Sequence, residues 1–174
     1  MGKQIILCVE ASKQALTDAI YIKEVISRFY EIDQSVKLSF VYMNGKTNYC
    51  SRSVQRNIKQ LSKDYKNGSS VVIYCVDLDK YESNPVQAKE NDDIKEYTVK
   101  NKYEMVWFCH DIEEVFLGES IEKRMKTEAA IDFKKKKQIL KVDAQKLMAK
   151  RRSKGSSNIM LVMNNYLKKK EIIS

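Results

Sequence analysis

"VVIYCVDLD", residues 71–79, is an apolar run that ends in two aspartates separated by a single leucine. Its β-branched and aromatic side chains predict a buried strand over residues 70–79. The segments 4–10, 36–43 and 104–110 have the same character and predict three further strands. Nearly continuous apolar strands are typical of a parallel sheet that is covered on both faces.

Helical patterns separate these four segments. Residues 17–32 place apolar side chains on one stripe, with Thr17 as the expected N-cap. Residues 53–68 predict a second helix that begins at Ser53 and stops at Gly68, and residues 91–102 a third, weaker one. The alternation of strands and helices predicts an α/β fold with a mostly parallel, Rossmann-like sheet of about four strands flanked by helices.

The remaining sequence continues without a visible repeat or linker. A helix is expected to open at Asp111, a long basic stretch follows, and residues 156–170 predict a capped apolar helix that closes the chain. We therefore expect an α/β core over residues 1–118 and a helical basic C-terminal segment over residues 119–174, packed on the same domain.

Composition restricts the class of protein. The 174 residues carry a formal net charge of +9, which suggests a polyanionic partner, most often nucleic acid, although lysine-rich surfaces also serve solubility. No apolar run is long enough for a membrane span or a signal peptide, so we expect a cytoplasmic protein that does not bind membranes. The four cysteines form no CxxC pair, which argues against zinc.

Carboxylates follow the predicted strands at the edge where an open α/β sheet binds its ligands. Glu10 ends the first strand, Asp77 and Asp79 end the third, and His110 ends the fourth. If the extended geometry persists, Asp77 and Asp79 point to the same side and repel each other unless a cation intervenes. Oxygen ligands favour magnesium, with manganese as the alternative. The competing interpretation is that these aspartates only form turns and helix caps.

Two motifs resemble those of the Toprim domain, which occurs in topoisomerases, primases and related nucleases. They are "IILCVE" with Glu10 and "VVIYCVDLD" with Asp77 and Asp79, and the resemblance covers about residues 4–117. The chain looks most like the small RloB-like and OLD-type Toprim nucleases, because "FCHDIEEVFL" (108–117) is similar to their later acidic element. It departs from the family at Ala11, where a glycine usually follows the glutamate.

The resemblance implies a magnesium-dependent nuclease, a hydrolase that cleaves phosphodiesters in DNA or RNA and takes part in phage or mobile-element defence. Glu10, Asp77 and Asp79 would be the metal ligands, with Glu10 also a possible general base. Glu113 and Glu114 cannot both face the site from one helix, and Glu114 is narrowly preferred as a further catalytic residue. The last candidate, His110, would donate a proton or contact phosphate, or else is a structural histidine.

Two alternatives to a nuclease stay open. The first is a non-catalytic, Toprim-like subunit that binds nucleic acid or joins a protein partner in a defence complex. The second is a phospho-signalling domain, which also binds magnesium at strand ends. That class normally needs a lysine and a Ser or Thr at later strand ends, whereas the fourth strand of this chain ends in His110.

Basic residues crowd the sequence between Lys123 and Lys154. They predict a sequence-independent grip on the nucleic-acid backbone beside the acidic site, because aromatic side chains are not interleaved with them. The alternative is an ordinary solvated surface. The candidate contacts are Lys13, Lys134, Lys135, Lys136, Lys137, Arg151 and Arg152.

Overall fold

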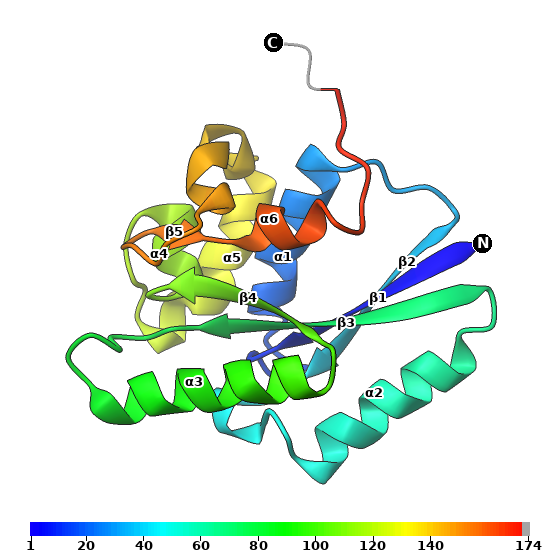
Figure 1. Cartoon of the computed structure of the whole chain (residues 1–174). Coiled ribbons are helices and arrows are strands. Elements are labelled where there is room, and N and C mark those ends of the chain that lie inside the picture. The colour runs from blue at the N-terminus through cyan, green and yellow to red at the C-terminus, as the bar shows by residue number, and fades with distance from the viewer. Residues whose placement is uncertain (172–174) are drawn as a thin grey trace.

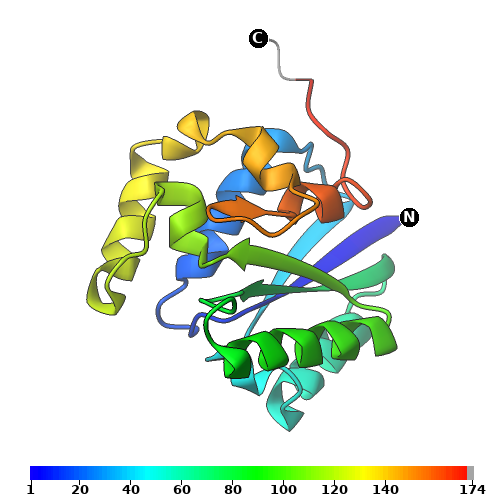
Figure 2. The same cartoon turned by 60° about the vertical axis from the view of Figure 1, so that its left-hand side comes forward.

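The computed structural model describes residues 1–171, so the last three residues of the expected C-terminal segment lie outside the described residues. A five-stranded sheet with the order β2-β1-β3-β4-β5 lies between two layers of helices (Figures 1 and 2). The strands are β1 (Gly2–Val9), β2 (Val36–Tyr42), β3 (Gly68–Asp77), β4 (Glu104–Cys109) and β5 (Ser156–Ser157). The α-helices are α1 (Thr17–Phe29), α2 (Arg52–Asp64), α3 (Pro85–Lys100), α4 (Ile112–Leu117), α5 (Lys126–Lys135) and α6 (Ile159–Met163).

The first four strands confirm the predicted mostly parallel sheet. Strand β1 lies between β2 and β3 and pairs in parallel with both, and β4 continues the parallel sheet beyond β3. Val9 pairs with Cys75, so β1 and β3 run alongside each other almost to their carboxyl ends. Residues that follow these two strands therefore emerge at the same edge of the sheet.

The sheet has a fifth strand that the sequence pattern did not predict. Strand β5 pairs antiparallel with the end of β4, where Phe108 faces Ser157 and Cys109 faces Ser156. Two serines have no apolar pattern, and the pairing joins segments far apart in the sequence, so local periodicity could not identify it. The edge of the sheet beside β4 is therefore partly covered.

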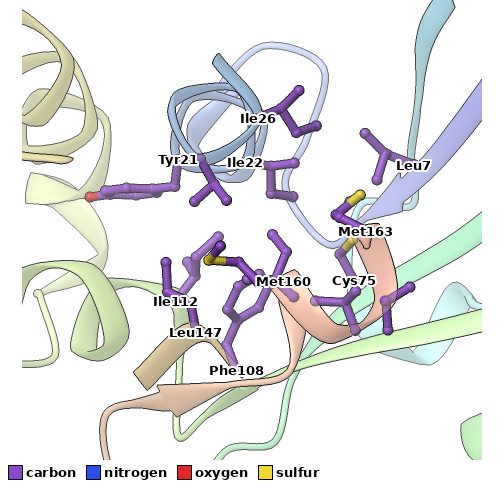
Figure 3. Packing of buried hydrophobic residues seen from close by; sticks show 14 of the residues in the cluster. Leu7, Tyr21, Ile22, Ile26, Cys75, Phe108, Ile112, Leu147, Met160 and Met163 are labelled. Carbon is purple, nitrogen blue, oxygen red and sulfur yellow. The ribbon is translucent and has the colours of Figure 1, made fainter. Parts of the chain in front are cut away.

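Both faces of the sheet are buried, which explains the unbroken apolar runs of the strands. Helices α1, α4, α5 and α6 cover one face, where Tyr21, Phe108 and Met160 pack in one buried cluster (Figure 3). Helices α2 and α3 cover the opposite face, where Ile58 and Ile94 belong to a second cluster. Successive residues of β1 alternate between the two clusters, as expected for a strand.

The segment after residue 118 packs on the α1 face. Phe133 and Leu147 lie in the same buried cluster as Tyr21. The segment is less regularly helical than its composition suggests, because short 3-10 turns at Lys123–Met125, Gln138–Lys141 and Ala144–Met148 interrupt it. The closing helix α6 is also much shorter than the apolar pattern of residues 156–170 predicts. Within residues 1–171, no helix has the length and apolar character needed to cross a membrane.

Two helices begin at other residues than expected. Thr17 is the first residue of α1, and Leu16 occupies the N-cap position in a left-handed conformation. Helix α2 is capped by Ser51, whose side chain accepts a hydrogen bond from the backbone N–H of Val54, rather than by Ser53. Either serine satisfies the sequence signature of a cap, and the tertiary path of the chain selects the earlier one.

Gly68 does not end helix α2 but opens strand β3. A Cβ atom at Gly68 would lie 1.7 Å from the carbonyl oxygen of Gly2, so only glycine permits this approach of the strands. Helix α3 begins before the predicted residue 91, because Asn84 accepts hydrogen bonds from two N–H groups of its first turn and Pro85 occupies its start.

Candidate functional site

Four carboxylates gather where β1 and β3 end. Glu10 directly follows β1 and Asp77 is the last residue of β3, while Asp18 and Glu113 lie in the first turns of α1 and α4. The backbone N–H of Asp77 donates to Oε1 of Glu10 at 3.1 Å, which joins the two strand ends directly. The structure thus brings together two sequence-predicted residues, Glu10 and Asp77, that are 67 positions apart.

Backbone N–H groups orient two of these carboxylates. Oδ2 of Asp18 accepts from the N–H of Ala11 at 2.9 Å, which holds the start of α1 against the end of β1. Oδ1 of Asp77 accepts from the N–H of Ile112 at 2.9 Å, at the start of α4. These bonds set the side chains before any ligand binds.

Burial, together with the charges of neighbouring carboxylates, disfavours the ionised forms of Glu10 and Asp77. Burial raises the pKa of Glu10 to about 8, although the Lys46 ammonium opposes the shift, and Asp18 and Asp79 add to it. Burial also raises the pKa of Asp77 well above its ordinary value, reinforced by the charges of Glu10, Asp18 and Glu113. A cation bound among these carboxylates would counter both the burial and the repulsion between carboxylates that raise their pKa values.

Glu113 has an unsatisfied oxygen. Its side chain is fully buried, and Oε2 accepts from Nζ of Lys126 at 3.0 Å. Oε1 has no hydrogen-bond partner within residues 1–171. A buried polar atom without a partner costs free energy, so a ligand that reached this oxygen would relieve that cost.

A cavity of about 470 Å³ opens beside the carboxylates of Glu10, Asp18 and Asp77. Glu10, Asp18 and Asp77 form its acidic wall, and Lys123 and Lys126 line it from the C-terminal segment. Acidic and basic groups therefore share one cavity, which suits a ligand that combines a cation with a phosphate. The other lining residues are Ala11, Ser12, Ala15, Thr17, Asn44, Gly45 and Thr127.

Asp79 lies apart from Asp77. Strand β3 ends at Asp77 and Asp79 has a left-handed φ of 53°, so the extended geometry that would align the two aspartates does not persist. Oδ2 of Asp79 lies 2.6 Å from Nζ of Lys46. The same ammonium donates to the backbone oxygen of Asp77 at 2.8 Å and to Asn91, which places a nearly buried lysine between the aspartates and α3.

His110 and Glu114 form a separate group. Nδ1 of His110 lies 3.0 Å from Glu114 and its Nε2 lies 3.0 Å from Glu82. Burial lowers the pKa of His110, but the hydrogen bonds to Glu82 and Glu114 outweigh it and raise the pKa overall. Of the two glutamates, Glu113 is the one that lies near Asp77, because the charge of Glu113 contributes to the raised pKa of Asp77.

Among residues 1–171, the only three acidic, histidine or cysteine side chains whose ligand atoms lie close enough together to share a metal ion are beside His110. Ligand atoms of Glu82, Cys109 and His110 lie within 4.8 Å of one another. The hydrogen bonds of His110 already account for this arrangement, and burial raises the pKa of the Cys109 thiol to about 11, which disfavours the thiolate that a metal needs.

Among the described residues, the basic side chains predicted to bind nucleic acid do not line the cavity. Lys13 is exposed on the loop before α1, and Arg152 stacks 5.5 Å above the ring of Tyr81. The run Lys134–Lys137 begins about 12 Å beyond Lys126 along α5. Arg151 is exposed near Arg152.

Sequence reasoning did not identify three residues of the site, which are Asp18, Lys46 and Lys126. Asp18 shows in the sequence only as an acid in the first turn of a helix, and its contact with Ala11 depends on the loop between β1 and α1. Lys46 follows the end of β2, and that position at the ligand-binding edge was the available signal. Lys126 carried no local signal, because it reaches Glu113 from another element, 13 residues further along the chain.

Comparison with protein-family models, curated proteins and solved structures found no match for this chain. The function of the site is therefore inferred from its own geometry and chemistry.

Proposed function

We propose that this protein is a Toprim-type nuclease that hydrolyses phosphodiesters in DNA or RNA with magnesium, or with manganese in its place. The observation that carries the proposal is the gathering of Glu10, Asp18 and Asp77 at one cavity that Lys123 and Lys126 also border, with Glu113 buried near Asp77. The Toprim type rests on the resemblance of the two sequence motifs, from which Asp79 departs by pairing with Lys46.

The chemistry of Glu10, Asp77 and Glu113 suits a hard divalent cation, but their ligand atoms do not lie within 4.8 Å of one another in the described part of the chain, so the carboxylates would have to draw closer around an ion. Every donor in the cluster is a carboxylate oxygen, one of which, Oε1 of Glu113, has no protein partner among residues 1–171. Glu10, Asp77 and Glu113 would hold the ion, and Asp18 would add negative charge beside them. When bound, the ion would polarise the scissile phosphodiester and stabilise the charge that develops on it.

The protein's own groups supply binding and proton transfer. Lys123 and Lys126 attract a phosphate to a cavity whose acidic wall would otherwise repel it. Glu10, whose pKa of about 8 keeps it protonated near neutral pH without a metal ion, would be ionised by a bound cation and would then accept a proton from the attacking water. Asp79 belongs to the proposed site through Lys46, which ties its carboxylate to the backbone of Asp77.

His110 and Glu114 are not needed for this mechanism. They bind each other and Glu82, which favours a structural role at the end of β4. A role in phage or mobile-element defence, a protein partner and a cytoplasmic location stay predictions from the sequence.

A non-catalytic subunit that binds nucleic acid is the second candidate. The observation in its favour is that Lys126 and Lys46 already neutralise two of the carboxylates, Glu113 and Asp79. A site balanced by internal lysines can be stable without a metal ion.

Cleavage of end-labelled DNA and RNA in magnesium, manganese or EDTA distinguishes these functions. We expect metal-dependent cleavage that falls at least about 100-fold in Asp77→Asn, as for loss of a metal ligand or its partner. The matched control is Asp132→Asn, an exposed carboxylate on α5 that pairs with Lys136. Cleavage that survives both EDTA and Asp77→Asn would contradict the proposed site. Binding without cleavage in every metal would favour the non-catalytic subunit.

A further inference from the structure

Helix α2 presents a stripe of basic side chains to solvent. The α2 basic stripe consists of Arg52, Arg56, Lys59 and Lys63, which follow one another at intervals of four, three and four residues on one helical face. The opposite face, with Val54 and Ile58, is buried against the sheet. Because α2 is anchored through that face, the basic stripe is held outward.

This part of the chain contains no acid to balance the stripe. Residues 34–63 contain no Asp or Glu, and they carry Lys37, Lys46, Arg52, Arg56, Lys59 and Lys63. Within residues 1–171, no carboxylate forms a salt bridge with any of the four stripe residues. Asp64, the acid that ends the helix, instead accepts hydrogen bonds from Gln60.

The arrangement costs helix stability. Arg52 with Arg56, and Lys59 with Lys63, are like-charged pairs at a spacing of four residues, which destabilises a helix. The stripe surrounds a shallow groove of about 390 Å³ that is lined only by its four cations and the amides of Gln55 and Gln60. The four cations have no internal carboxylate partner, which suits an external polyanion, whereas the two amides already donate to Cys50 and Asp64.

We propose that the α2 basic stripe binds the phosphate backbone of the nucleic acid on which the proposed nuclease acts; the identity of this ligand rests on the proposed function. The stripe extends about 16 Å from Arg52 to Lys63, long enough to contact several successive phosphates. Its first residue follows the loop whose Asn44 and Gly45 line the cavity, so bound backbone would continue from the candidate site along α2 (Figure 1).

An anionic membrane surface suits α2 less well. A helix that lies on a membrane buries an apolar face in the lipid, whereas the apolar face of α2 already packs on β1, β2 and β3. The stripe also differs from the run Lys134–Lys137, which lies on the other side of the sheet and in which Lys136 is paired with Asp132.

Binding measured without cleavage tests the stripe. Fluorescence anisotropy of the full-length protein with labelled single- and double-stranded DNA and RNA, in EDTA, gives affinities over a range of salt concentrations. The double variant Arg56→Gln/Lys59→Gln should bind about tenfold more weakly, with a salt slope about 1.5 to 2 smaller in magnitude, because two phosphate contacts are lost. The control Lys95→Gln/Lys100→Gln removes two exposed lysines from α3 and should change neither quantity.

The possible results separate the stripe from the nuclease. Weaker binding and a smaller slope in the α2 variant alone support the stripe, even if the protein never cleaves nucleic acid. Unchanged binding in the α2 variant, or equal weakening in the α3 control, overturns it, even if the protein is an active nuclease. The proposal for the stripe would also be overturned if the α2 variant lost binding to vesicles of anionic lipid but still bound nucleic acid as the wild type does.

Discussion

Burial protonates Glu10 in the metal-free protein at neutral pH, because its pKa of about 8 lies above the ordinary value of 4.5. The folded state therefore holds this proton more tightly than the unfolded state does. The resulting stability is fully present below about pH 4.5 and is lost as the pH rises through about 8. Ionising Glu10 beside Asp77 and Asp18 thus works against folding unless a cation is bound.

We predict that Glu10→Gln removes this dependence on pH. The amide keeps an oxygen that can accept from the N–H of Asp77 but cannot ionise. The quantity to follow is the melting temperature of the variant minus that of the wild type, both measured in EDTA. This difference should increase by about 5 °C or more when the pH is raised from about 5 to about 8. Thermal unfolding followed by circular dichroism measures it. If the melting temperatures of the wild type and of Glu10→Gln changed with pH in parallel, Glu10 would not be the group that makes stability depend on pH.

Individual residues of the site differ in how well the sequence predicts them. Glu10 and Asp77 could be paired in advance, because parallel strands bring their carboxyl ends to one edge. Asp79 could not be placed, because its left-handed backbone depends on the turn that follows β3. The choice between Glu113 and Glu114 depends on the rotation of α4 about its axis, which a six-residue helix does not reveal in its sequence.

At the scale of elements, Asn158 completes the edge of strand β4. Its Oδ1 accepts from the N–H of Trp107 at 2.8 Å, and its Nδ2 donates to the carbonyl of Met105 at 3.0 Å. The side chain thus continues the pairing that β5 begins. A single asparagine takes the place of further strand residues.

We predict that Asn158→Ala destabilises the protein by about 2 to 3 kcal/mol, because it leaves a donor and an acceptor of β4 without their partners. Urea unfolding gives the difference. Asn165→Ala, a change in the loop that follows α6, should cost less than about 0.5 kcal/mol. Equal effects of the two changes would show that the edge of β4 does not depend on Asn158.

The sequence identifies strands and long helices better than it identifies short elements. Four strands were recognisable because their apolar side chains pack in the two buried clusters on the faces of the sheet. The cap of α3 was also present in the sequence as Asn84 followed by Pro85, although only the later part of the helix was predicted. Strand β5 and the 3-10 turns depend on distant packing and have no periodic signal of their own.

At the scale of the whole molecule, the C-terminal segment is part of the candidate site as well as of the core. Phe133 and Leu147 anchor it on the α1 face, and Lys123 and Lys126 extend from it into the cavity beside Asp77. Composition predicted the basic character of this segment but not which lysines reach the acids. That assignment follows from the path of the folded chain.

The nuclease proposal depends on a divalent cation held among Glu10, Asp77 and Glu113. Anomalous diffraction from crystals of the full-length protein soaked in manganese locates such an ion directly, with Asp77→Asn as the comparison. We predict one strong peak at coordinating distance, about 2 to 2.5 Å, from oxygens of these side chains, and its loss in the variant. A peak at Glu82, Cys109 and His110 instead, or none at the cluster in saturating manganese, would contradict the proposed metal site.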